Sequence, residues 1–278
     1  MNPNMEVSGM GFARLVWAPS IRWSVSLIAN TDEGHQKSDA GKFHKSYAVK
    51  IDYTGNEEYT GVILSHKKNK IDGIGAFGGW TATDAMLIYA DIGFSKGNDI
   101  LYPVEDNMSP FELSMQTVDN DSSEWNGTLL TGASYTFMAG STFSLEYLYN
   151  SAGYTDKQAA EYYKLRKNAG NAYIESDSLG GISRMVLGQT ANPGMRFFRK
   201  NYMVFQYRQN YIHDSMSLSL SWIYNVDDKG GKLVSILDYT IGDHVRLFSI
   251  GYLNTGGSDT EFRNVLNSSL TIGLEYTF

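Results

Sequence analysis

The side chains that could carry out chemistry in this 278-residue chain are few and mostly isolated. There is no cysteine, so a disulfide, a zinc–thiolate site and covalent c-type haem attachment within the chain are excluded. The five histidines show neither the i, i+4 pair nor the H-E-x-x-H pattern of a zinc-binding helix, and no phosphate loop or dinucleotide fingerprint is present. The sequence therefore predicts no catalytic residue, no metal and no cofactor. The histidines are His35, His44, His66, His213 and His244.

Two short groups of residues could still act. His213 and Ser215 could form a base–nucleophile pair, but both fall in a predicted turn of two or three residues without a surrounding motif, so a turn histidine is favoured. Asp119, Asp121 and Glu124 have part of a calcium-loop spacing, but Glu124 occupies the position that requires glycine. A solvated acidic loop is favoured there, and an enzyme is not predicted.

The elements that position these side chains follow a period of two. In the last run, Leu270, Ile272, Leu274, Tyr276 and Phe278 alternate with Thr271, Gly273, Glu275 and Thr277. Successive side chains of a strand point to opposite faces, so one face of this run is apolar and the other polar. The alternation recurs in runs that begin at Ile21, Tyr47, Phe143 and Met216. Less regular runs cover 5–17, 58–67, 73–82, 85–95, 125–138, 200–213, 231–241 and 245–254.

These runs are close to the ~9–11 residues that cross a bilayer at a tilt, whereas no apolar run approaches the ~18–20 residues of a transmembrane helix. A soluble β-sandwich would also alternate, so two further features decide between them. Aromatic residues stand near the run ends on the apolar faces, as in the girdles of membrane barrels. The predicted girdle consists of Trp17, Trp23, Tyr53, Trp80, Tyr149, Trp222, Tyr276 and Phe278.

The second feature is the alternation of short and long connectors, which is typical of barrels with short periplasmic turns and long extracellular loops. The sequence therefore predicts an all-β fold, a transmembrane up-and-down antiparallel β-barrel that forms one domain over residues 1–278. About thirteen runs are visible, and single-chain bacterial barrels normally have an even number of strands. We therefore expect about fourteen strands, with sixteen as the alternative, and an upstream strand or signal peptide that this chain lacks.

The longest connectors are 152–199 and 96–124, and both are candidates to gate the barrel. Within the first, residues 157–168 predict a short helix with Asp156 as its N-cap and Gly170 as its stop. This extracellular loop could constrict the mouth, hold a partner, or form a lid over the outer rim.

The polar faces of the runs carry charged residues in mid-strand. They are Arg14, Arg22, Lys50, Asp52, Asp91, Glu146, Arg208, Asp238 and Glu275. We predict that they line a water-filled pore; the alternative is that they pair across the wall and brace a closed barrel. Lys50 and Asp52 are expected to share a face, and Arg14 and Arg22 to face one another across the first hairpin.

The C-terminal Tyr276-Thr277-Phe278 resembles the signal that the barrel-assembly machinery reads, and the chain as a whole resembles bacterial outer-membrane porins and exporters. The hairpin over 75–87 is similar to those of alginate-export-type porins. The resemblance implies a location in the bacterial outer membrane, and contacts with its lipid and lipopolysaccharide and with the assembly machinery.

The resemblance also implies a channel for passive diffusion or export of ions, small polar solutes or a polymer. One alternative is a structural barrel that sheathes or anchors a partner protein or polymer, and an outer-membrane hydrolase is the least favoured. The net charge of −7, without a basic stripe and interleaved aromatics, argues against nucleic acid as a partner.

Overall fold

The computed structural model describes residues 11–32, 45–67, 72–98, 100–117, 124–175, 178–263 and 267–277. Most of these residues belong to one antiparallel sheet in which neighbours in the chain are neighbours in space. Its thirteen strands are β1 (Gly11–Trp17), β2 (Trp23–Asp32), β3 (Ser46–Thr54), β4 (Glu58–Lys67), β5 (Asp72–Thr83), β6 (Met86–Lys96), β9 (Trp125–Thr136), β10 (Ser141–Asn150), β11 (Asn201–Ile212), β12 (Met216–Asn225), β13 (Gly231–Ile241), β14 (Val245–Thr255) and β15 (Ser268–Tyr276).

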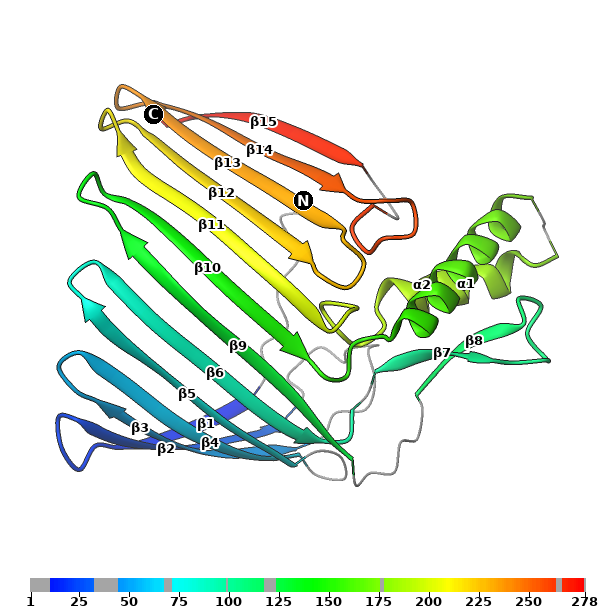
Figure 1. Cartoon of the computed structure of the whole chain (residues 1–278), viewed down its shortest axis with the longest axis horizontal. Coiled ribbons are helices and arrows are strands. Elements are labelled where there is room, and N and C mark those ends of the chain that lie inside the picture. Colours follow the sequence, from blue (N-terminus) through cyan, green and yellow to red (C-terminus); the bar gives the residue numbers. More distant parts are fainter. Residues whose placement is uncertain are drawn as a thin grey trace.

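Each predicted run corresponds to one of these strands, so the predicted all-β, up-and-down antiparallel fold is confirmed. The sheet curves into a trough, with β1 at one edge and β15 at the other (Figure 1). Among the described residues no ladder joins these two edge strands, and the trough is open. In a meander of thirteen strands the first and last run in the same direction, so antiparallel closure requires one further strand. The count of fourteen stays a prediction.

The two ends of the sheet differ in their connectors. Six turns of two to five residues lie at one end: 18–22, 55–57, 84–85, 137–140, 213–215 and 242–244. The long connectors 97–124, 151–200 and 256–267 lie at the opposite end, as does the five-residue turn 226–230. His213 and Asp214 have φ of 50° and 61°, a left-handed conformation that closes the tight β11–β12 turn. The hydroxyl of Ser215 donates to the carbonyl of His213 rather than to its ring, so this pair is a turn and not a base–nucleophile pair.

Two of the long connectors fold together beyond the strand ends into a unit that we call the external insert, residues 100–117 and 152–200 (Figure 1). It contains the hairpin of β7 (Leu101–Glu105) and β8 (Leu113–Thr117) and the helices α1 (Asp156–Glu175) and α2 (Gly180–Ala191). Its buried core consists of Ile100, Tyr102, Phe111, Leu113, Met115, Ala152, Tyr154, Ala159, Tyr162, Tyr163, Leu165, Ala169 and Val186. In the described part of the chain, no helix is long and apolar enough to cross a membrane.

The helix predicted over 157–168 is longer than expected. It continues past Gly170 to Glu175, because Gly170 does not take the left-handed conformation that stops a helix and because Leu165 and Ala169 are buried against the rest of the insert. Its N-cap is Thr155 rather than Asp156. The backbone N–H of Gln158 donates to Thr155 Oγ1 over 3.4 Å and Gln158 Oε1 accepts from the Thr155 N–H over 2.9 Å, which is a capping box.

Candidate functional site: the polar face of the sheet and the external insert

Strand register decides which side chains share a face. Directly paired residues of an antiparallel sheet point to the same side, and neighbours along a strand point to opposite sides. Asp52 pairs with Gly61, Gly61 with Phe77, and Phe77 with Asp91. Continued through every ladder, this pairing puts eight of the nine predicted pore residues on one side, which we call the polar face. They are Arg14, Lys50, Asp52, Asp91, Glu146, Arg208, Asp238 and Glu275.

Arg22 is the exception. It lies in the turn before β2, where its carbonyl accepts the N–H of Thr54 over 2.8 Å. The expectation that Arg14 and Arg22 face one another is wrong, because the register pairs Arg14 with Ile28. The guanidinium of Arg14 instead donates to Ser26 Oγ over 3.1 Å.

On β3, the expected proximity of Lys50 and Asp52 is present as an ion pair with 2.8 Å between Nζ and Oδ1. Ser24 donates to the other carboxylate oxygen of Asp52 over 3.4 Å. The Lys50 ammonium also lies 4.7 Å from the centre of the Phe77 ring. Phe77 itself lies over Gly61, where an added Cβ would come within 2.4 Å of the ring. The wall is therefore lined here by a paired charge and a flat aromatic ring.

A glycine makes the next contact possible. Tyr89 on β6 donates its hydroxyl to Glu146 Oε1 on β10 over 2.5 Å, although β9 lies between these strands. Gly132 is the β9 residue paired with both, and a Cβ there would stand 2.9 Å from the Tyr89 ring and from Glu146 Cγ. Only glycine leaves the path between them clear.

Near the short-turn end, Arg246 on β14 bridges two carboxylates. Its Nε and Nη2 donate to Asp238 Oδ1 over 2.9 and 2.5 Å, and its Nη1 donates to Glu275 Oε2 over 3.3 Å. Arg246 and Lys232 were missed from the sequence, although both belong to the polar face. Both residues occupy even-numbered positions, as Asp238 does in the run 231–241. The alternation within the runs 231–241 and 245–254 could therefore have identified them.

Asp91 and Arg208 differ from these paired groups. Within the described part of the chain, neither side chain has a hydrogen bond or an ion pair. Asp91 lines a hollow of about 550 Å³ together with Tyr59, Phe77, Gly75 and Gly93. Arg208 lines a second hollow of about 350 Å³ near the short turns. Their charges are therefore not compensated by an ion pair, unlike those of Lys50, Asp52, Asp238, Arg246 and Glu275.

The opposite side of the sheet, the apolar face, holds seven of the eight predicted girdle aromatics; Phe278 lies outside the described residues. Five stand near the short turns and two nearer the long loops. The first group is Trp17, Trp23, Tyr53, Trp80 and Tyr276, and the second is Tyr149 and Trp222. Some pack on their neighbours: the rings of Trp23 and Tyr53 are 4.9 Å apart.

Among the described strand residues, Asp, Glu, Lys and Arg on this apolar face occur only as the terminal residue of a strand, at Glu58, Asp72 and Lys96. The large apolar side chains elsewhere on this face are exposed, for example Leu270 at 69% and Leu274 at 68% on β15. A continuous apolar surface of this extent would be unfavourable in water and suits lipid.

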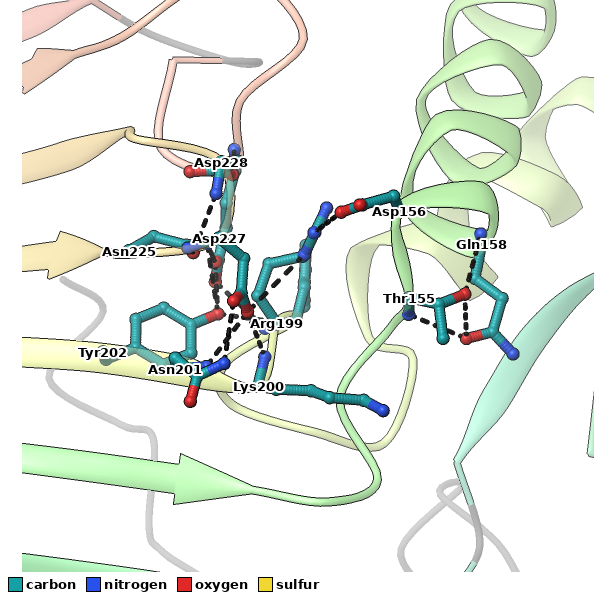
Figure 2. Close-up of polar contacts among 12 residues, drawn as sticks. Thr155, Asp156, Gln158, Arg199, Lys200, Asn201, Tyr202, Asn225, Asp227 and Asp228 are labelled. Carbon is teal, nitrogen blue, oxygen red and sulfur yellow. Dashed lines mark hydrogen bonds and ion pairs between the residues drawn. The ribbon is translucent and has the colours of Figure 1, made fainter.

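At the long-loop end, the insert is held to the sheet by a polar network (Figure 2). Arg199, almost fully buried, pairs with Asp156 at the start of α1, and its Nε lies 3.9 Å from Asp227 Oδ2. Asp227 accepts the backbone N–H groups of Lys200 and Asn201 over 2.9 and 3.0 Å. The turn 226–230 thereby holds both the first residue of β11 and, through Arg199, the first residue of α1.

The third connector joins this network through Glu261. Its Oε2 accepts the hydroxyl of Tyr202 over 2.5 Å and Asn225 Nδ2 over 2.9 Å, and its Oε1 accepts the N–H of Phe198 over 3.1 Å. Burial, with a smaller contribution from the charge of Asp228, raises the pKa of Glu261 to about 7 against the lowering effect of these donors. Asp119 and Asp121 of the acidic loop lie outside the described residues.

An antiparallel meander with one apolar face, aromatic rings towards both ends of its strands and short and long connectors at opposite ends is a transmembrane β-barrel wall of the bacterial outer-membrane type. No family model and no curated protein sequence matches the chain. Among the solved structures with a similar fold are two proteins of Pseudomonas aeruginosa and OccAB1 of Acinetobacter baumannii. It is 12% identical with a TM-score of 0.57, and the match covers 95% of this chain and 66% of that one.

The other two are OprD and OccK10 (OpdN) of Pseudomonas aeruginosa, each with a TM-score of 0.53 and covering 100% of this chain. OprD, an outer membrane protein, is 8% identical and covered over 72% of its length, and OccK10 is 11% identical and covered over 78%. Identities this low show the fold alone. The chain spans about two thirds of the length of OccAB1. The predicted fold, that of an outer-membrane type of β-barrel, is confirmed.

Proposed function

We propose that the chain forms an outer-membrane channel for the passive diffusion of small polar solutes along its polar face, with the external insert at the outer mouth. The observation that carries this proposal is the segregation of charge. Leaving aside residues that end a strand, five acidic and five basic side chains of the described strands lie on the polar face and none on the apolar face. The acids are Asp52, Asp91, Glu146, Asp238 and Glu275, and the bases are Arg14, Lys50, Arg208, Lys232 and Arg246.

Charged groups facing a closed interior would keep it hydrated, because each carries a large desolvation penalty in an apolar environment. Their equal number predicts weak selectivity between small anions and cations. Asp91 and Arg208 should influence selectivity more than the paired groups, since the ion pairs at Lys50 and Arg246 largely cancel their own fields.

Single-channel conductance in a planar bilayer tests this function, with the reversal potential measured under a salt gradient. Steady ohmic conductance and a reversal potential near zero are expected. Asp91→Asn removes a negative charge and shifts the reversal potential towards anion selectivity, and Arg208→Gln shifts it towards cation selectivity. Each variant is the matched control of the other. A folded protein without conductance overturns the channel, and shifts of the same sign overturn the assignment of the two residues to the pore.

A second candidate is a barrel that anchors a partner protein or polymer, favoured by exposed apolar side chains on the insert. Tyr173 and Ile174 near the end of α1 and Ile182 and Met185 on α2 are exposed, Ile174 to 84%. Surfaces of this kind mark interaction sites. Under this candidate the purified barrel is silent in the bilayer and a partner co-purifies with it, and replacement of Ile174 and Met185 by Ser releases that partner. If the double variant retains it, the insert is not the anchor.

We also propose that the apolar face contacts lipid and lipopolysaccharide, and that the assembly machinery reads the C-terminal strand. The alternation of Leu270, Ile272, Leu274 and Tyr276 on the apolar face of β15 supports the latter. Tyr276→Ser at the end of this strand should slow assembly in a reconstituted folding assay more than the same change at Tyr239, which lies on the same face of an inner strand. Equal slowing by both changes would argue against a specific role of the C-terminal strand.

A further inference from the structure

Three segments that are far apart in the sequence meet at the carboxyl group of Glu261. It lies in the connector between β14 and β15, and its hydrogen-bond donors come from the end of the insert (Phe198), the start of β11 (Tyr202) and the end of β12 (Asn225). The backbone N–H of Glu261 in turn donates to Asp228 Oδ2 over 2.9 Å. The residue as a whole keeps some exposure, but its carboxyl end is enclosed.

Few other contacts tie this connector down. Within residues 256–263, the neighbouring polar contacts are mostly local: Thr260 donates to the carbonyl of Gly257, and Arg263 donates to the carbonyl of Gly256. Thr260 is also buried against Gly230 of the turn 226–230. Among the described residues, the side-chain hydrogen bonds that join this segment to the insert, to β11 and to β12 are those of Glu261 with Phe198, Tyr202 and Asn225. The carboxyl group of Glu261 therefore supplies a large part of the contacts that dock this connector.

The charge state of that group matters because its surroundings are mainly acidic or neutral. The turn 226–230 presents Asp227 and Asp228, the residues before β11 present Arg199, β11 presents Tyr202, and α1 presents Tyr163. On α1, Tyr162 also faces Glu261, and the charge of Arg166 lies beyond it. Arg199 is already engaged by Asp156. Burial raises the pKa of Tyr163 above its ordinary value of 10, so its phenol stays neutral through the range in which Glu261 titrates.

We propose that Glu261 is a proton-operated latch that holds residues 256–263 against Phe198 of the external insert and the ends of β11 and β12, and that the latch closes when Glu261 takes up a proton. With a proton, Glu261 can donate to Tyr202 Oη, which also accepts the backbone N–H of Arg199 over 2.6 Å, and it still accepts from Asn225 and Phe198. Without it, a negative charge stays enclosed beside Asp228. Any effect of the latch on the passage of solutes rests on the proposed channel, whereas the latch itself does not depend on that function.

The sign of the pH effect follows from linkage. In the released connector Glu261 is in water and has its ordinary pKa of 4.5, whereas in the docked connector burial raises the pKa to about 7. The docked state binds more protons between these two values, so docking is strengthened as the pH falls and is lost as the pH rises through about 7. With these values, the docking equilibrium is about thirtyfold more favourable at about pH 5.5 than at about pH 8.5.

Hydrogen exchange of the folded full chain in detergent micelles tests the latch. Protection of peptides that cover 256–263, corrected for the intrinsic pH dependence of exchange, is compared at the two pH values for wild type, Glu261→Gln and Asp259→Asn. Asp259 lies in the same connector and bonds only to Ser258 in the described structure. We expect protection to fall up to about thirtyfold at the higher pH in wild type and in Asp259→Asn. In Glu261→Gln, protection should be independent of pH.

Protection that does not depend on pH in wild type overturns the latch, as does a pH dependence that survives in Glu261→Gln. If Glu261→Gln fails to fold, the pKa of Glu261 itself is measured by carbon-13 labelling of its carboxyl, and an ordinary value overturns the proposal. None of these readouts requires conductance. A silent bilayer with a working latch refutes the channel alone, and a conducting barrel with pH-independent protection refutes the latch alone.

Discussion

Leu165 is the residue on which the independence of the external insert can be tested most sharply. It lies in α1, it is 0% exposed, and every residue of the cluster around it belongs to the insert. Truncation of a buried leucine to alanine costs about 3 kcal/mol, the sum of a lost transfer free energy and a cavity. Since about 1.4 kcal/mol corresponds to a factor of ten, Leu165→Ala should raise the equilibrium constant for local opening of the insert roughly a hundredfold.

Hydrogen exchange with peptide resolution is the assay. Protection of α1, α2, β7 and β8 should fall by that factor, whereas protection of the inner strands β9 and β10 should not change. Ile174→Ala is the matched control, since Ile174 is on the same helix but 84% exposed, and it should change protection of the insert less than about twofold. Equal loss of protection in β9 and β10 would refute the reasoning, because it would mean that the insert and the sheet open as one unit.

Two further predictions concern the faces of the sheet and the network at its long-loop end. Leu220 and Ser221 are neighbours on β12, on the apolar and the polar face. Leu220→Arg should destabilise the barrel in lipid by about 2–4 kcal/mol and Ser221→Arg by far less, measured by denaturant unfolding in vesicles; equal effects would refute the assignment of faces. Tyr202→Phe removes the donor that lowers the pKa of Glu261, so the midpoint of the pH-dependent exchange of 256–263 should move above about 7. A downward shift would contradict the role given to this hydrogen bond.

The sequence predicted the strands well because a strand in the wall of a membrane barrel follows a simple rule, the alternation of apolar and polar side chains. Each strand has lipid on one side, so the period of two is enforced residue by residue, and it placed Lys50, Asp91 and Glu146 on the face where the structure has them. The rule failed for Arg22, which precedes its strand, because alternation gives no information about where a strand begins. Lys232 was missed although it has the same parity as Asp238, which the same run placed correctly.

The structure of the long connectors could not be obtained in this way. The helical propensity of 157–168 was visible, but the length of α1 was decided by burial of Leu165 and Ala169 against residues of another connector. In the same way, Gly132 reads in the sequence only as a weak strand residue. Its role depends on Tyr89 and Glu146, which reach each other across it from two other strands.

The amino-acid sequence by itself thus determined the class of fold, the faces of the strands and the ends at which short and long connectors lie, because these depend on local periodicity and on the solvent of each face. Only the tertiary structure decided that two connectors form one insert and that a third is tied to it through Glu261. The donors to this carboxyl group lie 36 to 63 residues away, and no local pattern marks partners at such separations. Its raised pKa likewise arises from burial, a property of the assembled fold.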